Sequence, residues 1–358
     1  MTHPLAKKVL RWYARHQRDL PWRKTKDPYA IWISETMLQQ TQVQTVLPYY
    51  HRFLARFPTV QSLAAASPGE VLKLWENLGY YARARHLHAA AAQIVGQLQG
   101  VIPKTEKELL LLPGIGSYTA AAIASIAYGE RVPAVDGNLR RVLCRVFALQ
   151  APLDHIRTQR LIHALAETVV PEKDPGPFNQ GLMDLGATVC TPRKPSCSAC
   201  PLKGLCLAAI KGLQEFLPMK KPRRPLPHKE MVAAVLVDRR GRALVVQRRP
   251  AGLLGGLWGF PGGEKRPYEP LSKALRRVVR EELGIEVTCG KALAAVKHAY
   301  THFRITVHAL QCWIGKGKPQ AIGCHRLQWA TAEDLDRLPF SRVDRKIMKA
   351  LSLTAGPR

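Results

Sequence analysis

The chain has 358 residues, a formal net charge of +28 and 46% hydrophobic residues. This length suits two domains that each bury a core, and the hydrophobic content excludes a disordered chain. No stretch reaches the roughly 20 uncharged apolar residues that a membrane span requires. Both halves of the chain are basic, which indicates a polyanionic partner such as nucleic acid, although a generically basic surface would give the same balance.

Residues 1–20 fit an amphipathic helix rather than a signal peptide, so we expect a cytoplasmic protein, located with the nucleoid if the source is bacterial. Helical patterns broken by turns continue to residue 212. Prolines among basic residues predict a linker at 213–229. Segments 230–238 and 242–249 predict a hairpin, and 305–313 predicts another strand. The fold class is therefore an all-α domain (1–212), a linker and an α+β domain (230–352).

Four of the eight cysteines cluster with the spacing C-x6-C-x2-C-x5-C: Cys190, Cys197, Cys200 and Cys206. Disulfides are not expected without an export signal, so four close thiolates indicate a soft metal centre, either zinc or iron-sulfur. The long, uneven outer gaps favour a cube-shaped iron-sulfur cluster over the paired knuckles of structural zinc. Four protein ligands would leave no open coordination position, so the cluster would be structural or transfer electrons.

A glycine-rich turn, Leu112-Pro113-Gly114-Ile115-Gly116, opens directly into an apolar helix. Free backbone N–H groups and the helix dipole at such a site can bind phosphate, although many such turns only cap a helix. Twenty residues beyond Gly116, Asp136 precedes Gly137, Asn138 and two arginines. This acid is either a functional residue or simply the N-cap of the next helix.

Together these residues resemble the helix-hairpin-helix DNA glycosylases, and the segments 32–50 and 77–88 are specifically similar to the MutY-type adenine glycosylases. The resemblance implies that residues 112–116 form the hairpin, that Asp136 is the catalytic aspartate and that the four cysteines ligate a [4Fe-4S] cluster. It also implies a monomer with no membrane partner. The implied partner is double-stranded DNA that contains adenine opposite 8-oxoguanine or guanine.

Two positions separate this chain from the endonuclease III family. Glycosylases that also cut the strand carry a nucleophilic lysine two residues after the second hairpin glycine, where this chain has Tyr118. Without that amine the reaction should stop at the abasic site. The endonuclease III family also lacks a carboxylate at the position of Glu35. An endonuclease III-like glycosylase and AP lyase, or a non-catalytic iron-sulfur DNA-binding protein, are the alternatives; the second has no need for Glu35 and Asp136 together.

The chemistry of adenine release requires both carboxylates. Adenine leaves only when a ring nitrogen is protonated, and Glu35 lies in an apolar helical pattern that should keep it neutral. Asp136 should stay ionised beneath the cationic sugar, as in retaining glycosidases. The resemblance implies that Tyr118 and Asn138 assist Asp136. The alternative for Glu35 is a solvated helix acid or a capping-box partner.

Base flipping needs groups that fill the gap in the duplex. By resemblance, Gln40 and Tyr80 wedge into the duplex beside the orphaned base, and Thr41 and Leu78 belong to the same surface. The hairpin glycines Gly114 and Gly116 belong to the DNA-binding set. A tyrosine after a glycine is otherwise more often ordinary packing.

Residues 263–285 nearly match the signature of Nudix hydrolases, through Gly263, Glu269, Arg277, Glu281, Glu282 and Gly284. Val278 replaces a glutamate that is a main metal ligand in active enzymes, so we expect the fold without the hydrolase activity. For metal binding we favour an amphipathic helix with solvated acids. In MutY-type enzymes the corresponding domain recognises 8-oxoguanine through a Phe-Ser-His loop, and the resemblance assigns that role to Tyr300, Thr301 and His302.

Overall fold

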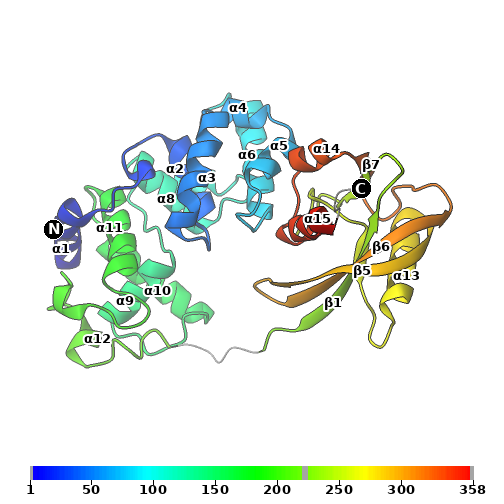
Figure 1. The fold of residues 1–358 in the computed structure, drawn as a ribbon. Coiled ribbons are helices and arrows are strands. Elements are labelled where there is room, and N and C mark those ends of the chain that lie inside the picture. Colours follow the sequence, from blue (N-terminus) through cyan, green and yellow to red (C-terminus); the bar gives the residue numbers. More distant parts are fainter. Residues whose placement is uncertain (1–2, 220–224, 355–358) are drawn as a thin grey trace. The chain divides into compact units, whose positions relative to one another are not determined.

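A computed structural model describes residues 3–219 and 225–354, with side chains as far as Leu351 (Figure 1). The described residues form two compact units. The helical unit comprises the residues up to Ala64 and those from Ala89 to Met219. The mixed unit joins Ala65–His88 to the residues from Pro225 onward. The mixed unit therefore draws on two separate stretches of the sequence.

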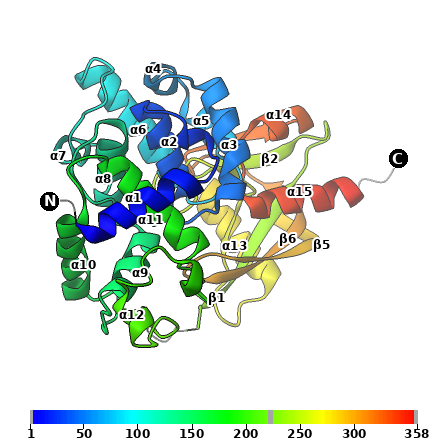
Figure 2. The same cartoon turned by 90° about the vertical axis from the view of Figure 1, so that its left-hand side faces the viewer.

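The described part of the helical unit consists of helices, which confirms the predicted all-α class. Its elements are α1 (Pro4–His16), η1 (Pro21–Arg23), α2 (Pro28–Leu38), α3 (Val43–Arg56), α4 (Val60–Ala64), the later part of α6 (Ala82–Gln97), α7 (Glu106–Leu109), α8 (Ser117–Ala127), α9 (Gly137–Val146), α10 (Ile156–Val169), α11 (Pro175–Thr188), η2 (Cys197–Ala199) and α12 (Leu207–Ile210). Helix α11 packs against α1, α8 and α9 (Figure 2).

Helix α11 comes very close to its neighbours because glycines face them. A Cβ added at Gly186 would lie 2.6 Å from the Cβ of Asn138, at the beginning of α9. A Cβ at Gly181 would lie 2.8 Å from Cγ1 of Val9 in α1. Real Cβ atoms are not found at such distances, so any larger residue would push the helices apart. Gly186 thereby helps to place Asn138.

Helix α2 is apolar nearly all round and is buried along most of its length. Asp27 caps its N-terminus, accepting hydrogen bonds from the backbone N–H groups of Tyr29 (3.0 Å) and Ala30 (3.3 Å). Pro28 then occupies the first helical position, where its missing N–H is not needed. A helix that is hydrophobic on every side belongs in the core, so its one acid, Glu35, is buried with it.

Among the described residues, the mixed unit contains two sheets and five helices or helix parts, which confirms the predicted α+β class. Its elements are α5 (Pro68–Leu74), the first part of α6, β1 (His228–Leu236), β2 (Ala243–Gln247), β3 (Trp258–Gly259), β4 (Gly262–Glu264), α13 (Leu271–Leu283), β5 (Glu286–Ala299), β6 (Arg304–Lys316), β7 (Arg326–Ala330), α14 (Ala332–Arg337) and α15 (Arg342–Thr354). The strand orders are β4-β1-β6-β5 and β3-β2-β7.

Helices α13 and α15 cover opposite faces of the four-stranded sheet. Along β1, Val232 and Ala234 pack in one apolar cluster with residues of α13, whereas Ala233 and Val235 pack in another with residues of α15. This alternation follows from the two-residue period of a strand. Strand β1 is therefore buried on both faces, and it pairs in parallel with β6 and antiparallel with β4.

The predicted hairpin of residues 230–249 is wrong. Strands β1 and β2 belong to different sheets, and only one isolated bridge, Val237 to Ala243, joins the segments around them. Both edges of β1 are already occupied by β4 and β6, so β2 pairs with β3 and β7 instead. The strand predicted at 305–313 is confirmed within β6.

The described residues of the predicted linker, 213–219 and 225–227, form no helix or strand, and β1 begins at His228. Residues 220–224 of that linker lie outside the described residues.

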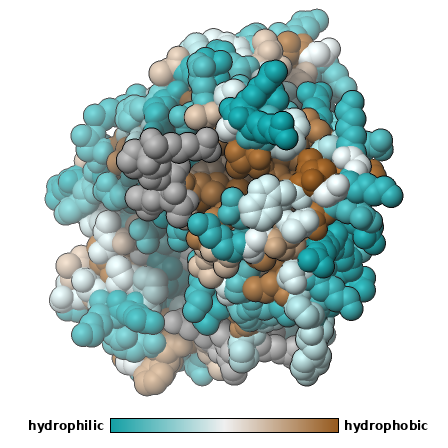
Figure 3. Space-filling model, turned by 45° about the vertical axis from the view of Figure 1, so that its right-hand side comes forward, coloured by the Kyte–Doolittle hydropathy of each residue, from teal (hydrophilic) through white to brown (hydrophobic). Residues whose placement is uncertain are grey.

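The surface drawn in Figure 3 is mostly hydrophilic, with hydrophobic side chains gathered in a few patches. No helix among the described residues is long and apolar enough to cross a membrane.

Candidate active site

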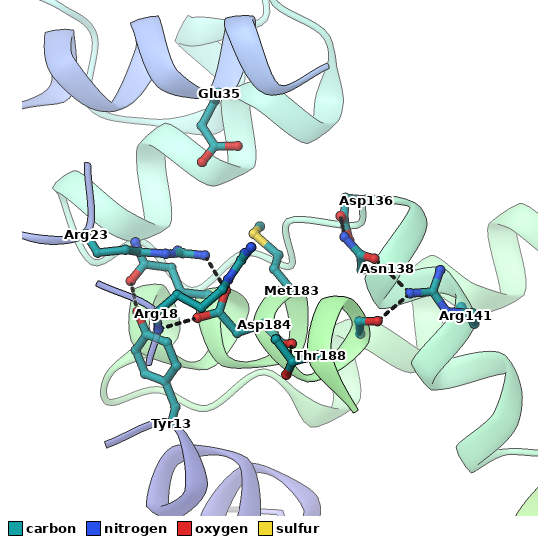
Figure 4. A network of polar contacts seen from close by, with 12 residues as sticks. Tyr13, Arg18, Arg23, Glu35, Asp136, Asn138, Arg141, Met183, Asp184 and Thr188 are labelled. Atoms are coloured by element: carbon teal, nitrogen blue, oxygen red, sulfur yellow. Dashed lines mark hydrogen bonds and ion pairs between the residues drawn. The ribbon is translucent and has the colours of Figure 1, made fainter. Parts of the chain in front are cut away.

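A cavity of about 830 Å³ in the helical unit brings together the four predicted catalytic residues and four of the predicted DNA-binding residues. Its walls come from η1, α2, the turn after α2, the glycine-rich hairpin before α8, the beginning of α9 and α11. The predicted residues that line it are Glu35, Gln40, Thr41, Gly114, Gly116, Tyr118, Asp136 and Asn138. Figure 4 shows Glu35 on α2 and Asp136 at the beginning of α9, with Met183 of α11 near both. A pocket with two carboxylates can carry out acid-base chemistry on a bound molecule.

Glu35 is 3% exposed, and the hydroxyl of Tyr118 donates a short hydrogen bond to its Oε2. Burial raises the pKa of Glu35, while the bond from Tyr118 and the charge of Arg23 lower it. The solvated-acid and capping-box alternatives for Glu35 do not fit this burial. The resemblance implied that Tyr118 assists Asp136, but its hydroxyl bonds to Glu35. The physical reason is that Tyr118 stands in the first turn of α8, which packs against α2.

Asp136 caps α9 and also lines the cavity. It is therefore both the N-cap of that helix and a candidate functional residue. Its Oδ1 accepts from the N–H of Leu139 at 2.7 Å, and its Oδ2 accepts from Nδ2 of Asn138 at 2.8 Å. Burial raises the pKa of Asp136, and these hydrogen bonds together with the charge of Arg141 lower it. Donors on both oxygens and the positive end of the α9 dipole favour the ionised form.

Asn138 is connected to the cysteine loop through Arg141 (Figure 4). The Nη2 of Arg141 donates to Oδ1 of Asn138 at 2.8 Å and to the carbonyl of Gly186 at 2.7 Å. Its Nε donates to the carbonyl of Cys190 at 2.8 Å. One guanidinium therefore joins the beginning of α9, the end of α11 and the first cysteine of the loop.

The cysteine loop gathers the four predicted ligands. All four cysteines line one small cavity. Arg145 is 1% exposed and donates to Sγ of Cys190 at 3.2 Å, while its Nη2 is buried without a partner among the described residues. A guanidinium buried in this way requires negative charge, which cluster-bound thiolates supply.

An ion-pair network beside the cavity was missed by the sequence reasoning. Asp184 is fully buried in α11, and its Oδ1 accepts from Nη2 of Arg18 at 2.7 Å and from Nη2 of Arg23 at 3.1 Å. Both arginines line the cavity (Figure 4). Nε and Nη1 of Arg23 are buried without partners among the described residues. An acid within the apolar run 182–186 is a signal that could have predicted a buried ion pair.

The remaining predicted DNA-contacting residues lie in the mixed unit. Leu78, Tyr80, Tyr300, Thr301 and His302 line one cavity of about 380 Å³. The hydroxyls of Tyr80 and Thr301 are hydrogen-bonded at 2.7 Å. Thr301 and His302 are exposed at the turn between β5 and β6, whereas Tyr300 is half-buried between the rings of His298 and Phe303.

Both residues predicted to wedge into DNA have unusual backbone geometry. The φ angles of Gln40 and Tyr80 are 57° and 49°. Left-handed conformations are uncommon for residues other than glycine, and they cluster at functional sites. Tyr80 is also 39% exposed, which does not fit ordinary packing of the ring in a core.

The acids of the Nudix-like segment are engaged in internal contacts. Arg277 pairs with Glu269 at 2.8 Å and with Glu281 at 3.2 Å. Hydrogen bonds from Arg277 lower the pKa of Glu269 to about 2. Glu282 accepts from the N–H of Gly262 at 3.0 Å. Val278 is 6% exposed and packs in the core beneath α13.

Family models match three segments in the predicted order. They are "HhH-GPD superfamily base excision DNA repair protein" at 33–186, "Iron-sulfur binding domain of endonuclease III" at 190–206 and "NUDIX domain" at 232–350. The adenine DNA glycosylase of Homo sapiens is 36% identical over 95% of this chain and 72% of its own length. The chain belongs to the adenine DNA glycosylase family. The adenine DNA glycosylases of Rattus norvegicus (36% identical over 95% of this chain and 76% of that protein) and Schizosaccharomyces pombe (28%, 96% and 88%) are further relatives.

Solved structures agree with the fold of this adenine DNA glycosylase family member. A thermostable thymine-DNA glycosylase is 33% identical, with a TM-score of 0.53 over 57% of this chain and 95% of that chain. A non-covalent endonuclease III–DNA complex is 21% identical, with a TM-score of 0.50 over 58% of this chain and 95% of that chain. The iron-sulfur match begins at Cys190 and ends at Cys206. The protein therefore carries a [4Fe-4S] cluster, which confirms the predicted cofactor.

Proposed function

We propose that this protein binds duplex DNA and excises adenine that lies opposite 8-oxoguanine or guanine, leaving an abasic site without cutting the strand. The observation that carries this proposal is the pair of carboxylates in one cavity, the buried Glu35 and the half-buried Asp136, which accept hydrogen bonds from different donors. The family membership supports adenine as the base that is removed.

The first chemical step is protonation of the flipped base. Adenine leaves the stack and enters the cavity of about 830 Å³. Glu35 is the proton donor, because burial raises its pKa and so favours the protonated carboxyl group. As a ring nitrogen takes this proton, the bond between the sugar and adenine breaks and its electrons remain on the base. Tyr118 holds Glu35 in position through its hydroxyl.

The second step takes place at the sugar. The departing base leaves an oxocarbenium-like cation, which the ionised Asp136 stabilises or captures until water completes the hydrolysis. Asn138 fixes Asp136 through the bond to Oδ2, and Arg141 fixes Asn138 in turn. The cavity has Tyr118 where a lyase needs an amine, so no Schiff base forms.

Recognition of the lesion rests on separate residues. The hairpin residues Gly114 and Gly116 present the N-terminus of α8 to phosphate. In the helical unit, Gln40 wedges into the gap left by adenine and Thr41 belongs to the same cavity wall. In the mixed unit, Tyr80 is the second wedge and Leu78 lines the same cavity as Tyr80. Thr301 and His302 contact 8-oxoguanine from the β5–β6 turn, with Tyr300 beneath them. Cys190, Cys197, Cys200 and Cys206 would hold the cluster, which supplies a rigid anchor or an electron-transfer group.

A gel assay tests this function directly. The purified protein is incubated with duplexes that carry adenine opposite 8-oxoguanine, guanine or cytosine, and each sample is divided for treatment with or without hot alkali. We expect strand breaks only after alkali, most on 8-oxoguanine and fewest on cytosine. Strand breaks without alkali would reveal a lyase, and intact strands in every lane would refute adenine excision.

A further inference from the structure

Two cysteines outside the cluster face each other across the β5–β6 hairpin. Cys289 of β5 is the register partner of Cys312 of β6, in antiparallel pairing. Directly opposite residues have Cα atoms about 4.5–5.5 Å apart, which lies within the roughly 4.4–6.8 Å span of disulfides. Opposite residues also share one face of the sheet, and both cysteines pack in the apolar cluster under α13.

The two thiols differ in accessibility. Cys312 is 2% exposed, whereas Cys289 is half-buried and its Sγ donates weakly to the carbonyl of Ser272 at 3.7 Å. Burial raises the pKa of Cys312 to about 12, so this group remains a thiol. An oxidant therefore reaches Cys289 first, and Cys312 lies directly opposite to complete the reaction.

We propose that Cys289 and Cys312 form a reversible cross-strand disulfide when the protein meets a peroxide. The Cys289 thiol is first oxidised by hydrogen peroxide to a sulfenic acid, and one water is released. The sulfur of Cys312 then attacks the sulfenic sulfur, the S–S bond forms, and the sulfenic oxygen leaves as a second water with the proton of Cys312. Two electrons pass from the two thiols to one peroxide, and a small thiol reverses the process.

The hairpin shows why this bond would matter. A register shift separates Cys289 from Ala292 on β5, so the hairpin is irregular next to the cysteine pair. The same hairpin ends in the turn that carries Thr301 and His302. A disulfide would close the chain into a loop around this turn and restrict the unfolded state. The inference concerns a modification site and goes beyond adenine excision.

Peptide mapping of the full-length, cluster-bearing protein tests the proposal. After graded hydrogen peroxide and alkylation, trypsin should release Cys289 in the peptide 281–291 and Cys312 in the peptide 305–316, each with one cysteine. We expect these two peptides to become linked, and dithiothreitol to separate them. Cys324 is a buried cysteine of the same apolar cluster and serves as the matched control. Cys324→Ser should keep the link, and Cys289→Ser should abolish it.

Thermal unfolding gives a second measurement. Peroxide treatment should raise the unfolding midpoint of the mixed unit by roughly 5 °C relative to Cys289→Ser treated in the same way. Both cysteines alkylated separately after peroxide treatment, or Cys289 linked to a different cysteine, would overturn the proposal even if a variant failed to fold.

Discussion

At the scale of single residues, the site depends on two acids with different surroundings, one buried and one half-buried. Glu35 has a neutral hydroxyl donor and apolar neighbours in α2. Asp136 has two N–H donors and the N-terminus of α9. Burial raises the pKa of both carboxyl groups, and the N–H donors on Asp136 oppose that rise by favouring its ionised form. This difference in environment assigns the roles of acid and cation stabiliser.

Replacing either carboxyl group with an amide should stop the reaction. Glu35→Gln cannot deliver a proton to adenine, and Asp136→Asn cannot stabilise the cationic sugar, so each should lower the single-turnover rate by about 10²–10⁴-fold or more. DNA binding should persist in both variants, as gel shifts would show. Glu172→Gln changes an exposed acid and serves as the matched control. Near wild-type rates in either site variant would refute the assigned roles.

Tyr118 should set the pH range of the reaction. Its hydrogen bond lowers the pKa of Glu35, so Tyr118→Phe should raise that pKa further. Because the protonated acid is the active form, the fall in rate at high pH should then begin at a higher pH. A single-turnover pH profile measures this shift. Tyr128→Phe removes a hydroxyl bonded to the carbonyl of Ile102 and should leave the profile unchanged. A shift to lower pH would contradict the argument.

The sequence predicted these residues better than it predicted their partners. The apolar run around Glu35 indicates burial, since a local pattern carries that information. The bond from Tyr118 joins residues 83 positions apart, and the pair of Arg18 and Asp184 joins residues 166 positions apart. Such contacts depend on how α2, α8 and α11 pack, which no local pattern specifies. The same limit hides the bond between Tyr118 and Glu35 from the sequence.

At the scale of elements, helix periodicity was more informative than strand pairing. The helical pattern of the first 212 residues and of α13 could be predicted because each helix has a local period. The pairing of β1 could not, because its neighbours β4 and β6 come from later in the chain. A short connection between two strands usually favours a hairpin. Here β1 pairs with β6 and β2 pairs with β7 instead, and both partners are distant in the sequence.

The contact between α11 and α9 gives a prediction at this scale. Gly186→Ala would place a Cβ 2.6 Å from the Cβ of Asn138, so α9 must shift. We expect a loss of about 1–3 kcal/mol in the free energy of unfolding, together with slower excision because Asn138 moves away from Asp136. Denaturant titration and single-turnover rates measure the two effects.

The matched control for this change is Gly96→Ala, in the helix α6. A Cβ there would meet nothing within 4 Å, so alanine should not disturb the folded state. Because alanine has less conformational freedom than glycine in the unfolded chain, the free energy of unfolding should stay the same or rise by about 0.5–1 kcal/mol. Equal destabilisation by the two substitutions would contradict the close-approach argument.

At the scale of the whole molecule, the acids proposed to release adenine and the residues proposed to sense 8-oxoguanine lie in different compact units. The composition of residues 213–229 predicted a linker. No local pattern in the sequence indicates that Ala65–His88 groups with the C-terminal residues. That grouping depends on long-range pairs such as Arg345 with Glu76, whose Nη2 and Oε2 are 3.1 Å apart. The bond between Tyr80 and Thr301 belongs to the same set of contacts.

This division predicts that cutting and lesion preference can be changed separately. Thr301→Ala removes a hydroxyl that contacts Tyr80 and that we propose contacts 8-oxoguanine. A hydrogen bond to a base contributes about 1–3 kcal/mol, so the ratio of single-turnover rates on 8-oxoguanine and guanine pairs should fall roughly tenfold or more. His302→Ala should have a similar effect, and the rate on adenine opposite guanine should change less.

Two variants serve as controls for this prediction. Thr301→Ser keeps the hydroxyl and loses only the methyl group, so it should retain the preference. Thr288→Ala removes an exposed threonine hydroxyl from β5 of the same hairpin, well away from the turn in sequence, and should have no effect on the ratio. If Thr301→Ala lowers the rates on both pairs equally, the residue supports cutting rather than sensing. The separation of tasks between the two units would then be wrong.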